Sequence, residues 1–200
     1  RYTMIIQGVT LTGISAYDAS FNSAGALLYL DAGNAASYSG LGTTWTDLST
    51  YQNNATLTNG PPWTSASSAS YFSFNGTNQY APVTTSKMNV VYTGKTTMFS
   101  IKTVSATQSA SFTVTDNQWI VVAVTQTTSG VVTYYVNGQQ IGTPATGVTF
   151  TQFINSGIEA VARSDNYWSG DMGVCAVYGQ ALTADQIQQN FNALRGRYGI

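Results

Sequence analysis

The chain has 200 residues, of which 43% are hydrophobic and only 8% are charged, with seven Lys or Arg, eight Asp or Glu and no His. A net charge of −1 gives no basic surface for nucleic acid, and no apolar run approaches the roughly 18–20 residues of a membrane span. We therefore expect one β-rich domain whose partners include neither nucleic acid nor a membrane.

The first 25 residues differ in pattern from the rest of the chain. They alternate loosely between apolar and polar residues and contain several Ser, Gly and Asn breaks. We predict an attachment arm over residues 1–25, with one or two strands, and a second unit over residues 26–200 that opens with a buried strand at 26–30. A long ordered loop system is expected over 34–70, and its apolar anchors are Trp45, Leu48, Leu57 and Trp63.

Short strand-like runs separated by turn residues continue as far as residue 177. The clearest hairpin is 131–142, since Asn137-Gly138 between alternating runs is typical of a type I′ turn. Cys175 is expected to be a buried structural thiol, because the chain has no His to activate it. The other expected strands are 71–74, two within 96–115, 119–125, 150–154, 157–162 and 172–177.

The last twenty residues form the only segment with a clear helical pattern. Thr183 is a suitable N-cap, and Gln186 three residues later completes a capping box. Gly196 is expected to end the helix in the left-handed conformation. The residues that share one apolar face are Ile187, Phe191 and Leu194.

Many short strands closed by one helix predict an all-β fold, an antiparallel two-sheet jelly-roll sandwich with a short C-terminal α-helix. Several pieces, read in order over 26–200, resemble the laminin-G-like, concanavalin A-like jelly-roll domains of phage, giant-virus and bacterial surface proteins. Those pieces are LYLDAGNAASYSG at 28–40, WTDLSTYQNNATLTNGP at 45–61, FSFNGTNQY at 72–80, WIVVAVT at 119–125, YYVNGQQIGT at 134–143 and the segment 167–200. The resemblance implies two curved antiparallel sheets with the helix against one end. The chain departs from the family where Asn75 and Gln79 replace residues that are often acidic, which weakens any transfer of a ligand or calcium site.

The residues argue against catalysis. A glycosidase needs two carboxylates facing each other across the scissile bond. The only Glu, Glu159, has no carboxylate partner at i+2 or i+4 of its expected strand, and without His there is no Ser-His-Asp machinery. We therefore predict that the chain is not an enzyme.

Two kinds of binding site have candidate residues. Calcium is the candidate cofactor, with Asp165 and Asp171 flanking a turn that could add backbone carbonyls, although both residues could instead cap turns. Carbohydrate would need aromatic faces and polar hydrogen-bonding groups, and its candidate residues are Tyr38, Tyr80, Tyr167 and Trp168. The alternative for each aromatic residue is that it packs a loop onto the sandwich.

Low charge, hydroxyl-rich faces and the N-terminal arm predict a non-enzymatic structural or attachment module. Such a module would belong to a virion or another extracellular surface assembly, as a capsid decoration, fibre or adhesion subunit. Its expected partners are neighbouring copies in a homo-oligomer, capsid or fibre lattice, and cell-surface glycan. The alternative is a lectin-like carbohydrate-binding module, assisted by calcium.

Overall fold

The computed structural model describes residues 4–6, 9–11, 20–66, 69–83, 92–103, 117–150, 160–161 and 167–200. Its strands are β1 (Met4–Ile6), β2 (Val9–Leu11), β3 (Ala26–Asp31), β4 (Thr44–Trp45), β5 (Ala55–Thr56), β6 (Trp63–Ser65), β7 (Ser70–Asn75), β8 (Ala81–Pro82), β9 (Gly94–Thr103), β10 (Trp119–Thr127), β11 (Val132–Val136), β12 (Gln139–Ala145), β13 (Ala160–Val161) and β14 (Ser169–Tyr178). The helix is α1 (Ala184–Tyr198). No helix among these residues is long and apolar enough to cross a membrane.

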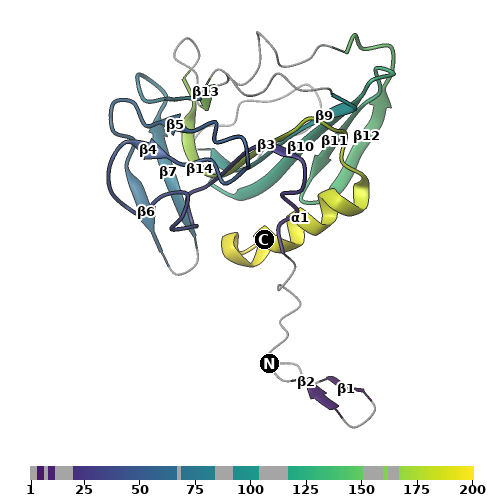
Figure 1. Cartoon of the computed structure of the whole chain (residues 1–200), viewed down its shortest axis with the longest axis horizontal. Coiled ribbons are helices and arrows are strands. Elements are labelled where there is room, and N and C mark those ends of the chain that lie inside the picture. The colour runs from purple at the N-terminus through teal and green to yellow at the C-terminus, as the bar shows by residue number, and fades with distance from the viewer. Residues whose placement is uncertain are drawn as a thin grey trace.

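One large antiparallel sheet dominates the fold (Figure 1). Its strand order is β12-β11-β10-β9-β14-β7-β6, and β3 also pairs with β14. The short strands β4 and β5 pair with each other, as do β8 and β13, and an isolated bridge between Ala55 and Val83 joins the two pairs. These short strands form a second layer, so the predicted β-sandwich with one C-terminal helix is confirmed.

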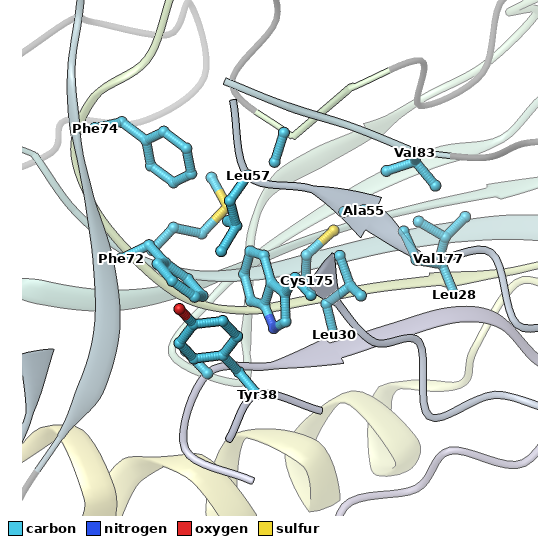
Figure 2. Close-up of a cluster of buried hydrophobic side chains, with 14 of the residues drawn as sticks. Leu28, Leu30, Tyr38, Ala55, Leu57, Phe72, Phe74, Val83, Cys175 and Val177 are labelled. Atoms are coloured by element: carbon cyan, nitrogen blue, oxygen red, sulfur yellow. The ribbon is translucent and has the colours of Figure 1, made fainter. Parts of the chain in front are cut away.

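Side-chain alternation divides the large sheet into two apolar faces. The face toward α1 carries Met98, Val121, Val174 and Ala176, which pack with buried residues of the helix. The opposite face, whose cluster is drawn in Figure 2, packs against the loop layer and surrounds the fully buried Trp45. Figure 1 shows the same arrangement, with α1 on one side of the sheet and β4, β5 and β13 on the other.

Cys175 belongs to this second cluster, and Figure 2 shows its side chain among Leu30, Ala55 and Val177. The thiol is fully buried, and burial raises the pKa of Cys175 above its ordinary value. A buried thiol with a raised pKa stays protonated and unreactive at neutral pH. The prediction of a buried structural cysteine is confirmed.

Helix α1 begins as the sequence predicts but ends later. Thr183 accepts a hydrogen bond from the Gln186 backbone N–H, and the Gln186 side chain accepts one from the Thr183 N–H, so the capping box is present. The predicted stop at Gly196 is wrong, because the helix continues to Tyr198 and Gly199 ends it with φ +69°. The last turn is held by packing: Tyr198 contacts Trp119 at a tilt, with ring centroids 4.4 Å apart, and its hydroxyl lies against Gly173, where a β-carbon would not fit.

Most strand predictions that fall on described residues are confirmed, including 26–30, 71–74, 119–125, 172–177 and the 131–142 hairpin. Asn137 and Gly138 have φ of +49° and +79°, as a type I′ turn requires. Phe150 is described but lies outside any strand. The second strand predicted within 96–115 and most of 150–162 fall outside the described residues.

Residues 20–25 of the predicted arm are attached to the sandwich. The Asn22 N–H donates to Asn190 Oδ1 (2.6 Å), Asn190 Nδ2 donates to the Tyr178 hydroxyl (3.1 Å), and that hydroxyl donates to the Asn22 carbonyl (2.7 Å). Phe21 stacks on Tyr29 with centroids 4.5 Å apart. Strands β1 and β2 pair with each other in a small separate sheet. The boundary at residue 25 remains a prediction, while the contacts of the described segment with the sandwich begin at Ser20.

Candidate functional site

The turn between β7 and β8 is held together by side-chain amides. Asn75 Oδ1 accepts hydrogen bonds from the backbone N–H groups of Thr77 (2.9 Å) and Asn78 (3.1 Å), while its Nδ2 donates to Asn78 Oδ1 (2.8 Å). Gln79 Oε1 accepts from the Asn75 N–H, and Gln79 Nε2 donates to the carbonyls of Asn59 and Gly60. A carboxylate could accept hydrogen bonds but not donate them, so the bonds that Asn75 Nδ2 and Gln79 Nε2 donate need amides at these two positions.

A second loop packs beside this turn. The Thr58 N–H donates to the Tyr80 carbonyl (2.8 Å), and Asn59 Nδ2 donates to the Asn78 carbonyl (2.7 Å). Asn59 and Gly60 both have φ of +58°. An Asn-Gly pair signals a turn in the sequence, but it does not reveal which other loop that turn contacts. For this reason sequence reasoning missed Asn59 and Gly60.

Three of the four predicted aromatic residues come together at this end of the sandwich. The half-buried rings of Tyr80 and Tyr167 lie with centroids 6.1 Å apart at an interplanar angle of 58°. Trp168 packs against the core cluster, and its carbonyl accepts a hydrogen bond from the Gly76 N–H (2.9 Å). We call this region the loop-end surface, and its residues are Asn59, Gly60, Asn75, Asn78, Gln79, Tyr80, Tyr167 and Trp168.

Tyr38 does not belong to this surface. Its side chain is 8% exposed and makes edge contacts with Trp63 and Phe72 inside the core (Figure 2 shows it beside Phe72). The Tyr38 hydroxyl donates to the Gly42 carbonyl (3.0 Å). The predicted stacking role does not fit this position, because the ring is a loop anchor, which was the alternative.

Asp171, one of the two predicted calcium ligands, is already paired. Its Oδ2 lies 2.7 Å from Lys102 Nζ, and its Oδ1 accepts a hydrogen bond from the Ser73 hydroxyl (2.6 Å). Asp165 lies outside the described residues. Within the ranges that the structure describes, no group of three or more His, Cys, Asp or Glu side chains could hold a metal ion. Calcium binding therefore stays a prediction.

The buried carboxylates of Asp31 and Asp47 stabilise the backbone. Asp31 Oδ1 accepts hydrogen bonds from the Gly33 N–H and from Arg197 Nη1. Asp47 accepts from the backbone N–H groups of Tyr29, Ser49 and Asn53. Because the Ser49 N–H, two residues after Asp47, donates to the Asp47 side chain, Asp47 forms an Asx turn.

Comparison with known protein families identifies the superfamily to which this fold belongs. The family described as the concanavalin A-like lectin/glucanases superfamily matches residues 61–188, which is more than half of the chain. Comparison with the curated proteins finds no match.

Several solved structures are similar to this chain. Domain 4 of AbnA, an extracellular arabinanase from Geobacillus stearothermophilus in complex with arabinotriose, matches 82% of this chain and 97% of that chain at 13% identity and a TM-score of 0.61. A mutant Trypanosoma rangeli sialidase with trans-sialidase activity matches 90% of this chain at 14% identity and a TM-score of 0.57. The binding domain of botulinum neurotoxin DC, in complex with rat synaptotagmin II, matches 86% at 14% identity and a TM-score of 0.60. This chain spans 34% of the sialidase chain and 52% of the neurotoxin chain, and such identities show a shared fold alone.

Proposed function

Since this chain belongs to the concanavalin A-like lectin/glucanase superfamily, we propose that it is a non-enzymatic attachment domain that binds carbohydrate at its loop-end surface. The observation that carries the proposal is the pair of half-buried rings, Tyr80 and Tyr167, beside a framework of exposed amides. The site of action is extracellular, on a surface assembly or a secreted protein.

The chemistry of this surface suits a neutral polyhydroxylated ligand. Tyr rings supply large, rigid contact area at low conformational-entropy cost, and Asn side chains supply adaptable hydrogen bonds. The backbone of both loops is held by hydrogen bonds that Asn59 and Gln79 donate and that Asn75 accepts. A preformed surface loses little entropy when a ligand binds, so even a small contact area retains measurable affinity.

The solved structures support the choice of the first ligand. The arabinanase domain was solved with arabinotriose, and this chain covers nearly all of that domain. We therefore take linear arabino-oligosaccharides as the first panel, followed by a general glycan array. A ligand that binds only the folded state raises the melting temperature with the logarithm of its concentration.

The test compares Tyr167→Ala with Tyr51→Ala. Tyr51 is also a half-buried loop tyrosine, but it belongs to the loop between β4 and β5 and packs against the core cluster around Trp45. We expect Tyr167→Ala to raise the dissociation constant at least tenfold, or about 1.4 kcal/mol, while Tyr51→Ala leaves it unchanged. Equal affinities for the two variants, or no glycan bound by the wild type, would overturn the proposal.

A second candidate function is a repeated structural subunit of a virion, fibre or other surface lattice. The observation that favours it is the β1–β2 hairpin, which forms a sheet separate from the large one. In this function the hairpin would pair with a neighbouring subunit by strand addition. Deleting residues 1–19 keeps the contacts made by residues 20–25, so the truncated chain should melt like the full chain but stay monomeric by light scattering. Assembly identical to that of the full chain would refute this candidate.

A further inference from the structure

A second cluster of polar and aromatic side chains lies on the face of the large sheet that packs against α1. Lys102 on β9 contacts Asp171 on β14 at 2.7 Å, and its Nζ lies 5.2 Å from the ring centroid of Tyr71 and 5.6 Å from that of Trp119. The Ser73 hydroxyl donates to the other oxygen of Asp171 (2.6 Å). We call these five residues the Lys102 cluster.

The cluster is partly exposed to solvent, with Lys102 more exposed than the nearly buried Asp171. The Lys102 side chain is 24% exposed and that of Asp171 is 11% exposed. Tyr71, Ser73 and Trp119 are each half-buried. Tyr71 and Trp119 meet edge to face with centroids 5.4 Å apart. The ammonium and the carboxylate are therefore fixed beside two aromatic rings and within reach of a ligand.

Asp171 differs from the other described carboxylates in the groups that it contacts. Asp31 and Asp47 accept hydrogen bonds from backbone N–H groups, and Asp185 lies in the first turn of α1, where a negative charge is favourable. Among the described residues, the contacts of Asp171 are with the side chains of Lys102 and Ser73. Replacing a nearly buried ion pair by apolar residues is often neutral or stabilising, so this pair is weak evidence for a role in stability.

The donors and acceptors of the Lys102–Asp171 pair complement two adjacent hydroxyl groups of a ligand. With its partners among the described residues, each oxygen of Asp171 keeps a lone pair, and the Lys102 ammonium keeps N–H groups beyond its ion pair. One ligand hydroxyl can donate to the carboxylate while the adjacent hydroxyl accepts from the ammonium. Such bonds to charged groups are stronger than bonds between neutral groups.

One residue of the loop-end surface, Asn75, lies on the same strand as the cluster residues Tyr71 and Ser73. Tyr71, Ser73 and Asn75 alternate along β7 with the core residues Phe72 and Phe74. Asn75 pairs with Ser169 and Ser73 pairs with Asp171. Asn75 of the loop-end surface is therefore two residues, or about 6.6 Å along the strand, from Ser73 of the cluster.

We infer that the Lys102 cluster is a second contact region for carbohydrate, which binds adjacent hydroxyls of an extended oligosaccharide whose other end lies on the loop-end surface. This inference rests on the proposed function and adds the class of ligand. The ligand is a chain of at least two or three sugar units, and a single sugar occupies only one of the two regions.

Two of the four tryptophans report on the two regions separately. Trp119 belongs to the cluster and Trp168 to the loop-end surface. Their indole N–H signals can be assigned in a ¹⁵N spectrum with Trp119→Phe and Trp168→Phe. We expect arabinose to shift the Trp168 signal alone and arabinotriose to shift both signals.

The outcomes separate the two proposals. A shift of Trp168 alone with arabinotriose, and with the longer oligosaccharides found on the array, would overturn the inference and leave the proposed function intact. A shift of Trp119 alone would overturn the loop-end surface as a binding site and, with it, the inference that one oligosaccharide spans both regions. No shift of either signal with any of these sugars would overturn both.

A variant pair measures the contribution of the charges. The double variant Lys102→Gln, Asp171→Asn replaces the ion pair by two amides of similar size that can still bond to each other. We expect it to melt within a few degrees of the wild type and to bind arabinotriose at least tenfold more weakly, with arabinose binding unchanged. Lys95→Gln is the control, because Lys95 lies on the same strand and also faces a ring, that of Phe150 at 5.8 Å. Equal losses in the double variant and in Lys95→Gln would overturn the inference.

Discussion

Replacing Asn190 by alanine should detach residues 20–25 from the sandwich. Asn190 is fully buried on α1 and links that helix to two partners, the Asn22 N–H at 2.6 Å and the Tyr178 hydroxyl at 3.1 Å. The substitution removes both hydrogen bonds, each of which contributes about 1 kcal/mol. It also leaves the Asn22 N–H without its acceptor in a partly buried position, which costs about 1–2 kcal/mol more.

The expected loss is therefore about 3–4 kcal/mol in the free energy of unfolding. For a chain of this size, that corresponds to a fall of about 6–16 °C in melting temperature. Urea denaturation followed by tryptophan fluorescence gives the free energy, and limited proteolysis reports whether the chain becomes cleavable near Asn22. The matched control is Asn192→Ala, since Asn192 lies on the same helix and accepts one hydrogen bond, from Gln188 at 3.2 Å. A loss for Asn190→Ala within about 0.5 kcal/mol of the control would refute the reasoning.

Three further predictions concern the helix end, alkaline stability and calcium. Gly196→Ala should stabilise the chain by about 0.5–1 kcal/mol, because Gly196 lies inside the helix. Gly199→Ala should destabilise it by about 1 kcal/mol, because Gly199 has φ +69°. Thermal melts in which both variants shift the melting temperature in the same direction would contradict this prediction. Burial raises the pKa of Cys175 and of Tyr178. Their contribution to stability is therefore complete below about pH 8.5 and is lost as the pH rises through the range where the unfolded thiol and then the unfolded phenol ionise. Melting curves from pH 7 to pH 11 should show this decline in stability, and a flat profile would count against it. Asp171→Asn should respond to millimolar calcium as the wild type does, since both oxygens of Asp171 already have partners; a calcium-dependent rise in melting temperature that only the wild type shows would restore Asp171 as a ligand.

Local signals in the sequence were sufficient for much of the fold. The turn at Asn137-Gly138 and the N-cap at Thr183 were predictable because each depends on residues within a few positions. The end of α1 was not predictable in this way. Both Gly196 and Gly199 could stop a helix, and the choice is made by Tyr198, which packs against Trp119 and Gly173, distant in sequence.

The candidate site shows the same limit. Tyr38 and Tyr80 look alike in the sequence, since each lies in or beside a polar loop. Their difference comes from Trp63 and Phe72, which enclose Tyr38 only after β6 and β7 have paired. Likewise, the partner of Asp171 is set by the register of β14 against β9, which places it opposite Lys102.

The position of β14 in the sheet has a consequence for the order of synthesis. This strand pairs with β3, β7 and β9, so it joins the two halves of the large sheet. It is also the last strand along the chain, ending at Tyr178 of 200 residues. During translation the sheet therefore lacks this connecting strand until residues 169–178 have been made, and the edges of β3, β7 and β9 that pair with it stay unpaired for that time. Such late, long-range pairing slows folding and exposes strand edges to other chains. A truncated chain that ends before residue 169 should consequently aggregate rather than yield a smaller stable domain.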